Sequence, residues 1–158
     1  MSEWIGELKK QVETRDSRIA EETTFRLMRM QALRVHTDLC WAQLKEQLTH
    51  DCRDLQQGIR AEGYRCSIQA PRTNTFLVVN DSLSKSLELI YYPEISRIDI
   101  TGIEIVSIQG PQRKFLLEIL QFGLGRNESL VISIGERIFH NLEELSRYLF
   151  EQILPHQT

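Results

Sequence analysis

Apolar residues recur about every 3.6 positions through the first part of the chain, which is the spacing of one face of an α-helix. Residues 1–62 contain no proline and only two glycines, Gly6 and Gly58. Strong helix formers predominate here, and the next residue, Gly63, is of the type that commonly ends a helix in the left-handed conformation. We therefore predict a helical segment over 1–62. It is either continuous or kinked at 21–25, where two adjacent threonines have low helix propensity.

The pattern then changes to alternating or continuous short apolar runs rich in β-branched residues. Turn residues separate these runs, so we predict six to eight short strands over 63–140, joined antiparallel because the connections are short. Thr101-Gly102 is interpreted as a tight turn. Residues 114–122 fit either a strand or a helix. We favour the strand, because the glycines and proline on either side leave room for at most about three helical turns.

A second helix is predicted over 141–154. Asn141 is a suitable N-cap, and Glu144 lies three residues further on, as in a capping box. One apolar stripe follows, formed by Leu142, Leu145, Leu149 and Ile153. The order of elements predicts a single α+β domain over 1–158, in which an antiparallel sheet curves around a helix.

The N-terminal helix carries two apolar stripes. At 100° per residue, the first occupies roughly a third of the helix circumference; it consists of Met30, Leu33, Thr37, Cys40, Trp41, Leu44, Leu48, Cys52, Leu55 and Ile59. The second lies near the opposite side. Because one stripe is enough to pack a helix on its own domain, either the first 22 residues fold back over the second stripe or another chain covers it. The expected interface residues, including two from the C-terminal helix, are Met28, Ala32, Val35, Leu39, Phe150 and Leu154.

The run from Arg34 to Cys52 concentrates histidines and cysteines and raises the question of a metal site. His36 and His50 are separated by about 21 Å on a straight helix, whereas zinc ligands lie about 2.0–2.3 Å from one ion. Both cysteines belong to the first apolar stripe, where cysteine behaves as a small hydrophobe. We predict no metal site and no cofactor here. No arrangement of residues along the chain suggests a catalytic site either.

Net charge and cysteine content narrow the functional classes and cellular locations that remain. The formal net charge is −3, without the basic excess on which nucleic-acid binding usually depends. No run approaches the 18 or so apolar residues of a membrane span. Three cysteines do not form a disulfide framework, so we expect a cytoplasmic protein with reduced thiols.

Two functional hypotheses follow. The first is a non-catalytic interaction module, acting as an adaptor, chaperone-like or regulatory protein, that forms a homodimer or binds a protein partner through its helical segment. The alternative is a domain that binds a small molecule or lipid in a pocket between sheet and helix. Glu118 is the one acid singled out as a candidate for an inward-facing carboxylate. The expected pocket residues are Tyr64, Phe76, Tyr91, Phe115 and Glu118.

Overall fold

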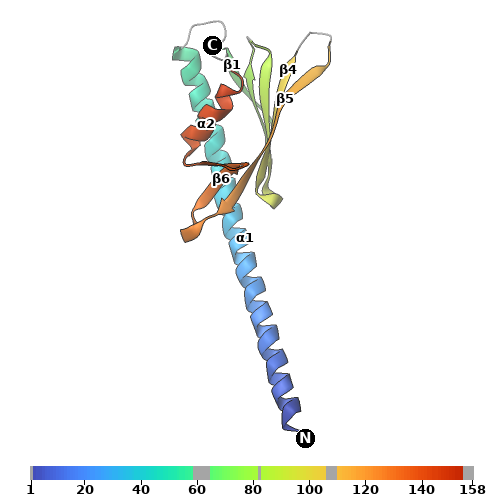
Figure 1. Ribbon diagram of the computed structural model, residues 1–158. Helices are drawn as coiled ribbons and strands as arrows, with labels where there is room; N and C mark the ends of the chain where they lie inside the picture. The colour runs from blue at the N-terminus through green and yellow to red at the C-terminus, as the bar shows by residue number, and fades with distance from the viewer. Residues whose placement is uncertain (1, 59–64, 82, 106–109, 155–158) are drawn as a thin grey trace.

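The computed structural model describes residues 2–58, 65–81, 83–105 and 110–154. Within these ranges the chain forms two α-helices and one open antiparallel sheet of seven strands, which confirms the predicted α+β fold (Figure 1). The helices are α1 (Glu3–Gly58) and α2 (Leu142–Glu151). The strands are β1 (Cys66–Arg72), β2 (Thr75–Asn80), β3 (Lys85–Tyr92), β4 (Arg97–Ile105), β5 (Gln112–Leu124), β6 (Leu130–Ile134) and β7 (Arg137–Phe139).

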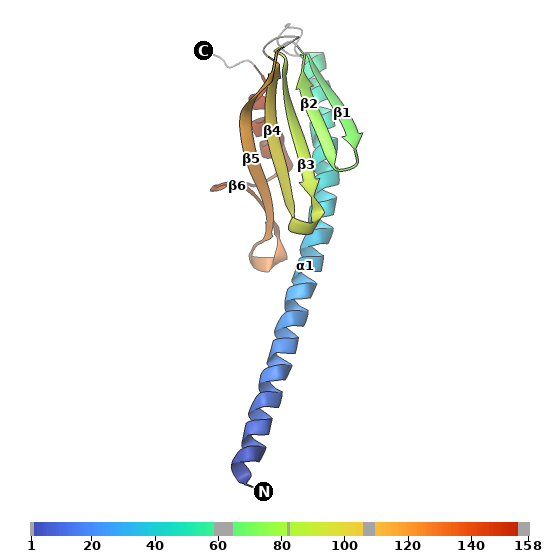
Figure 2. The ribbon, with the colours of Figure 1, turned by 90° about the vertical axis from the view of Figure 1, so that its right-hand side faces the viewer.

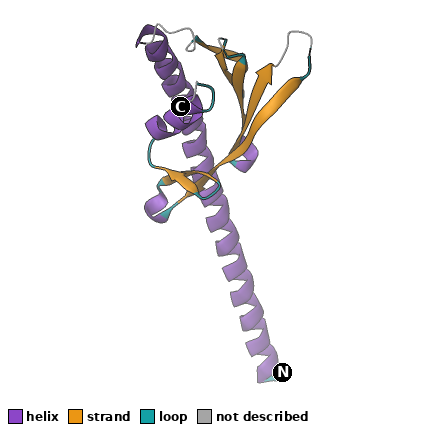
Figure 3. Ribbon diagram, turned by 45° about the horizontal axis from the view of Figure 1, so that its top comes forward, coloured by secondary structure: helices purple, strands orange, loops and turns teal. Residues whose placement is uncertain are grey.

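The sheet is a meander, because its spatial order β1 to β7 is also the order of the strands along the chain. Both helices lie on one face of the sheet, behind it in Figure 2. The sheet curls, so that α1 contacts strands as far apart as β1, β5 and β6 (Figure 3). Pro93 ends β3 and begins a short 3-10 helix, η2 (Pro93–Ile95), at the corner between β3 and β4.

The core lies between this face of the sheet and the C-terminal half of α1. Leu44 and Leu48 of α1 are fully buried, as is Leu145 of α2. Successive side chains of a strand point to opposite faces, so every second residue of the central strands enters the same core. The fully buried members on β3 and β4 are Leu87, Leu89, Ile98 and Ile100.

α1 runs through residues 21–25 without a break, so the possible kink there is absent. The hydroxyls of Thr23 and Thr24 donate hydrogen bonds to the carbonyl oxygens of Ile19 and Ala20, at 2.8 and 2.9 Å. Bonding one turn back keeps these polar groups within the helix rather than capping a new one. The first 22 residues therefore do not fold back, and they extend the helix away from the sheet (Figures 1 and 2). The expected helix end at Gly63 lies outside the described residues.

The interpretation of Thr101-Gly102 as a turn was wrong. Both residues lie inside β4, opposite Leu117 and Leu116 of β5. The register shifts next to Gly102, where Phe115 is the extra residue of a β-bulge on β5. This glycine allows β5 to approach β4 closely at the bulge. By contrast, 114–122 is strand, as favoured, within the long β5.

The capping pattern predicted for α2 is present. The side-chain oxygen of Asn141 accepts a hydrogen bond from the backbone N–H of Glu144 at 2.8 Å. The Glu144 carboxylate in turn accepts from the backbone N–H of His140 at 3.0 Å, one residue before the usual partner. These bonds fix the start of α2 and so place its buried face against α1 and the sheet.

Candidate functional site

The N-terminal half of α1 projects away from the body of the protein (Figure 1). From Glu3 to Gln31 every side chain is exposed except that of Ile5, which is half-buried. Thr37 is the first buried residue along the helix. We call residues 3–31 the projecting segment, and it is the feature that most clearly lacks a packing partner among the residues that the structure describes.

One face of the projecting segment continues the face that α1 buries in the core, and on it large apolar side chains are interspersed with the charged side chains of Arg15, Glu22 and Arg26. Relative to Leu44, its residues lie within about −40° to +100° around the helix, close to the angular range of the buried stripe. Their exposed fractions are between 50% and 64%. We call this set the front stripe; it consists of Trp4, Leu8, Val12, Ile19, Leu27 and Met30.

The predicted interface residues of α1 form a second exposed face, which we call the back stripe. Met28 is 64% exposed, Val35 68% and Leu39 56%, while Ala32 is half-buried. The two predicted residues at the C-terminal helix differ from these. Phe150 is only 4% exposed because it packs within its own chain, and Leu154 is half-buried. The structure thus groups the four α1 residues on one exposed face and separates Phe150 from them.

A hollow of about 420 Å³ lies where α1 leaves the body of the protein. Leu27, Met30 and Leu33 line it from α1, and Ile95 and Phe122 line it from the corner after β3 and from β5. Ile95 is 59% exposed, so an apolar surface is open at this point. We call this hollow the notch. It is continuous with the front stripe, because Leu27 and Met30 belong to both.

A second hollow, of about 470 Å³, lies between α1 and α2. Its apolar residues are Leu55, Phe150 and Leu154. Charged side chains also line it, and among the described residues acidic ones predominate: Asp51, Asp54, Glu143 and Glu151, with Arg147 as the one basic residue. Arg147 forms an ion pair with Glu151 at 2.9 Å.

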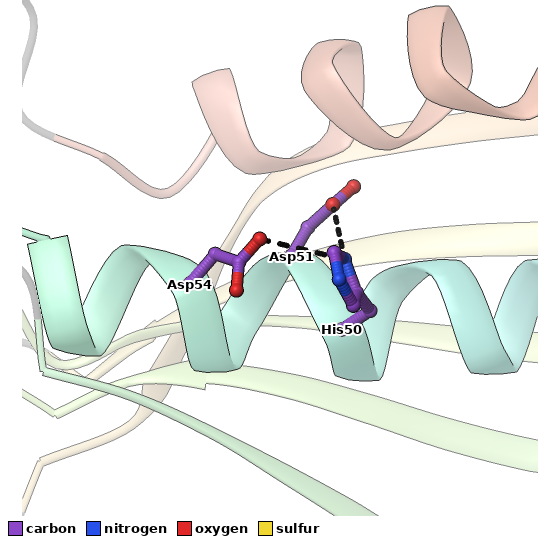
Figure 4. Close-up of side chains that lie close together, drawn as sticks. All are labelled: His50, Asp51 and Asp54. Atoms are coloured by element: carbon purple, nitrogen blue, oxygen red, sulfur yellow. Dashed lines mark hydrogen bonds and ion pairs between the residues drawn. The ribbon is translucent and has the colours of Figure 1, made fainter.

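Asp51 and Asp54, which line this hollow, lie close to the side chain of His50 on the same helix (Figure 4). His50 Nδ1 lies 3.4 Å from an Asp51 oxygen and 3.5 Å from an Asp54 oxygen. The Asp51 carboxylate is already engaged, because Gln47 and Ser146 donate hydrogen bonds to it. The Ser146 bond, at 2.6 Å, joins α1 to α2. Asp51 therefore connects the two helices, on a surface where His50 and Asp54 are exposed.

The two cysteines of the run from Arg34 to Cys52 lie on the buried face of α1, as the helical periodicity predicted. Cys40 and Cys52 are buried in the core together with Cys66. Burial raises the pKa of both the Cys40 and Cys66 thiols to about 11. These two thiols are therefore protonated at neutral pH, whereas a reactive cysteine needs a thiolate.

Two of the predicted pocket residues meet in an aromatic cluster. Tyr91 stacks on Trp41 with ring centroids 5.4 Å apart, and Phe76 meets Trp41 edge-on at 6.4 Å. Phe76 and Tyr91 are almost fully buried, and the Tyr91 hydroxyl donates a hydrogen bond to Asp38. Burial, followed by this hydrogen bond, raises the pKa of Tyr91 to about 12. The space between sheet and helix at this point is filled by packed rings.

The other predicted pocket residues have separate surroundings. Glu118 accepts hydrogen bonds from the Tyr148 hydroxyl, with both oxygens at 2.6 Å. Phe115 is half-buried beneath Lys85, whose Nζ lies 5.5 Å from the ring centroid. Tyr64 lies outside the described residues. The structure therefore does not bring Phe115 and Glu118 into the cluster around Trp41, and a ligand pocket formed by the set stays a prediction.

The contacts of Tyr148 were not predicted from the sequence. Its ring is covered by the guanidinium of Arg137, 4.8 Å from the centroid, and it packs on Phe139 at 5.4 Å. Burial is the main cause that raises the pKa of Tyr148 to about 12, and the Glu118 carboxylate adds to it. The cluster joins α2 to β5 and β7, so its role is to hold the C-terminal helix on the sheet.

Comparisons with known proteins give no family. No protein-family model matches the sequence, and no curated protein or solved structure is significantly similar to it. Among the described residues, no helix has an apolar stretch long enough to cross a membrane.

The front stripe was missed by the sequence reasoning, which followed the first apolar stripe only from Met30 onward. The available signal was the continuation of the same helical positions toward the N-terminus, through Ile19, Val12 and Leu8. In the folded core these positions face the sheet, but beyond the notch α1 no longer has a sheet beside it (Figure 1).

Proposed function

We propose that this protein is a non-catalytic interaction module that self-associates through the N-terminal segment of α1. The observation that carries the proposal is the exposure of large apolar side chains along the projecting segment, on a helix that leaves the body of the protein. Six such side chains on the front stripe are at least half exposed. Met28, Val35 and Leu39 of the back stripe are also more than half exposed, and of these Met28 lies within the projecting segment. The role of such a module would be adaptor-like, chaperone-like or regulatory.

Physical chemistry favours a partner for this segment. An isolated helix in water draws little stability from its own hydrogen bonds, and most helical stability in proteins comes from packing an apolar face. Burial of apolar area stabilises by about 25 cal/mol per Å². A monomer rarely exposes contiguous apolar surface of more than a few hundred Å², and larger patches usually mark interaction sites. Helices with regularly spaced anchors are a common form of such a site.

The mass of the purified full-length chain, measured by light scattering over a concentration series, tests the proposal. We expect a mass of two chains or more at micromolar concentration. A single-chain mass throughout the series would defeat self-association.

Paired substitutions then locate the contact on α1. Leu8→Asp with Ile19→Asp alters the front stripe, and Met28→Asp with Leu39→Asp alters the back stripe. We expect at least one pair to reduce the mass to one chain with an unchanged circular dichroism spectrum of the body. Leu117→Asp is the matched control, because Leu117 is 73% exposed on β5, away from α1. An associated wild type unaffected by both pairs would contradict the role of α1. Loss of the β-sheet signal in the back-stripe variant would place Met28 and Leu39 in the domain core and remove them from the interface.

A further inference from the structure

The order of positive and negative charges along the projecting segment is complementary to the same order read from the other end. Read from Glu3 to Arg29, the signs are − − + + − + − + − − + +. Reading backward from Arg29 and inverting each sign gives the same series. The center of this pattern falls between Arg15 and Asp16.

An antiparallel pair of these segments, centered at that point, places opposite charges at similar levels along the common axis. In this arrangement residue i lies level with residue 31 − i of the second copy, or within about 3 Å of that level at 1.5 Å per residue. The charged residues that share a level are Glu3 with Arg29, Glu7 with Arg26, Lys9 with Glu22, Lys10 with Glu21, Glu13 with Arg18, and Arg15 with Asp16. Parallel helices in register would instead place each charged residue level with the same residue of the other copy, so that like charges meet.

The charges select an orientation more than they supply affinity. Exposed ion pairs contribute only about 0.2–1 kcal/mol each. Packed helices lie about 8–10 Å apart, near the Debye length at physiological salt, so charges at one level interact where both lie beside the packed faces, as Arg15 and Asp16 do. Pairs on the far faces of the two helices, such as Lys10 with Glu21, contribute much less. Complementary charge patterns of this kind fix register and disfavor the wrong arrangement. The affinity must come from the apolar side chains.

The same center aligns the front stripe of one copy with that of the other. Val12 lies level with Ile19, and Leu8 lies level with Thr23, on the same side of the helix. Trp4 lies level with Leu27, which lines the notch. A tryptophan side chain buries up to about 250 Å² and packs best in an apolar recess. The notch, of about 420 Å³, offers such a surface beside Leu27, Met30 and Ile95. The polar part of its lining consists of Gln31, Arg34, Glu94 and Ser96.

We propose that the partner of the projecting segment is a second copy of this chain, bound antiparallel, with Trp4 of each copy in the notch of the other. This inference rests on the proposed function, self-association through α1, and adds the orientation of the two helices. The Trp4 side chain of the partner copy fills each notch, and the two sheets lie at opposite ends of the pair of helices. The two Thr37 residues are then about 65 Å apart along the axis, so the dimer presents its two α1–α2 hollows at a fixed separation.

Cysteine cross-linking of the full-length chain tests the orientation. A disulfide requires Cα atoms no more than about 7 Å apart. In the antiparallel dimer, Leu8→Cys in one copy faces Thr23→Cys in the other, whereas two Leu8→Cys copies are about 22 Å apart along the axis. The native Cys40, Cys52 and Cys66 are buried and serve in the unsubstituted chain as the background control.

We expect disulfide-linked dimers only when the two variants are mixed before oxidation. Cross-linking of each variant with itself would show parallel helices and overturn the inference. A two-chain mass without either cross-link would also overturn it, while leaving self-association intact. A single-chain mass would instead refute the proposed function itself.

Charge reversal provides a second, independent test. Glu3→Lys with Glu7→Lys places positive charge level with Arg26 and Arg29, and we expect the dissociation constant to rise about tenfold. An equimolar mixture with the Arg26→Glu, Arg29→Glu variant should restore the wild-type affinity. The control is Glu128→Lys with Glu136→Lys, which makes the same change in net charge on exposed residues outside α1. An unchanged dissociation constant in the Glu3, Glu7 variant would contradict the antiparallel register.

Discussion

A methyl group on Gly102 would lie 2.7 Å from the Cζ atom of Phe115, closer than real side chains approach one another. The ring of Phe115 crosses β4 at the β-bulge, and only a residue without a side chain leaves room for it. A feature that looks like a turn signal in the sequence is thus a packing requirement between two central strands.

Gly102→Ala is expected to destabilise the protein by about 1–3 kcal/mol, because overpacking forces the ring or the strand to shift. Urea unfolding followed by circular dichroism measures the change. Gly123→Ala on the neighboring β5 is the control, since nothing lies within 4 Å of its added methyl group. Phe115→Leu should recover part of the loss in the double variant. Equal unfolding midpoints for the two glycine variants would contradict this explanation.

Tyr91→Phe is expected to lower the free energy of unfolding by about 1–3 kcal/mol. The substitution removes the hydrogen bond to the Asp38 carboxylate and the contact of 3.0 Å with the Thr37 hydroxyl, which is buried. Its sequence neighbor Tyr92 points to the opposite face and is 37% exposed. Tyr92→Phe should therefore change stability by less than about 0.5 kcal/mol. A similar effect of both substitutions in urea unfolding would refute the role of the Tyr91 hydroxyl.

Stability is expected to fall as the pH rises above 9. Burial raises the pKa of Cys40 and Cys66 from 9.0 to about 11, so between these values the unfolded chain loses thiol protons that the folded chain keeps. The pKa of Tyr91, raised from 10.0 to about 12, acts in the same direction at higher pH. Unfolding midpoints in urea, measured from pH 7 to 11, should be constant at first and then decrease. The decrease should be shallower in Cys40→Ala, and a midpoint that rises over this range would contradict the assignment.

Trp4→Ala is expected to weaken self-association by roughly tenfold or more, as for other buried aromatic anchors of interfaces. Trp4 is 64% exposed within its own chain, so the body of the protein should retain its stability. Trp4→Phe should lose less affinity because it keeps an aromatic side chain. Sedimentation equilibrium of the three proteins gives their dissociation constants. Identical constants would exclude Trp4 from the interface.

Much of the fold follows from local signals in the sequence. Pro93 ends β3, and Asn141 with Glu144 starts α2, because these residues act through their own backbone geometry. The role of Gly102 has no such local signal, since a glycine needed for a turn and one needed for close packing look the same without the position of Phe115.

The candidate site was predicted only in part. The back stripe stood out in the sequence because it lies opposite the core face of α1. The front stripe has the same pattern as a core face, and only the position of the sheet shows that it lacks a cover beyond the notch. Periodicity shows which face of a helix is apolar, but not how far along the helix the rest of the protein reaches.

The mass of the chain in solution, measured by light scattering from low to high micromolar concentration, shows whether α1 pairs with a second copy of itself. We expect a mass of two chains, reduced to one by Leu8→Asp with Ile19→Asp while the sheet stays folded. A mass of one chain at every concentration would show that the exposed face of α1 does not pair with itself.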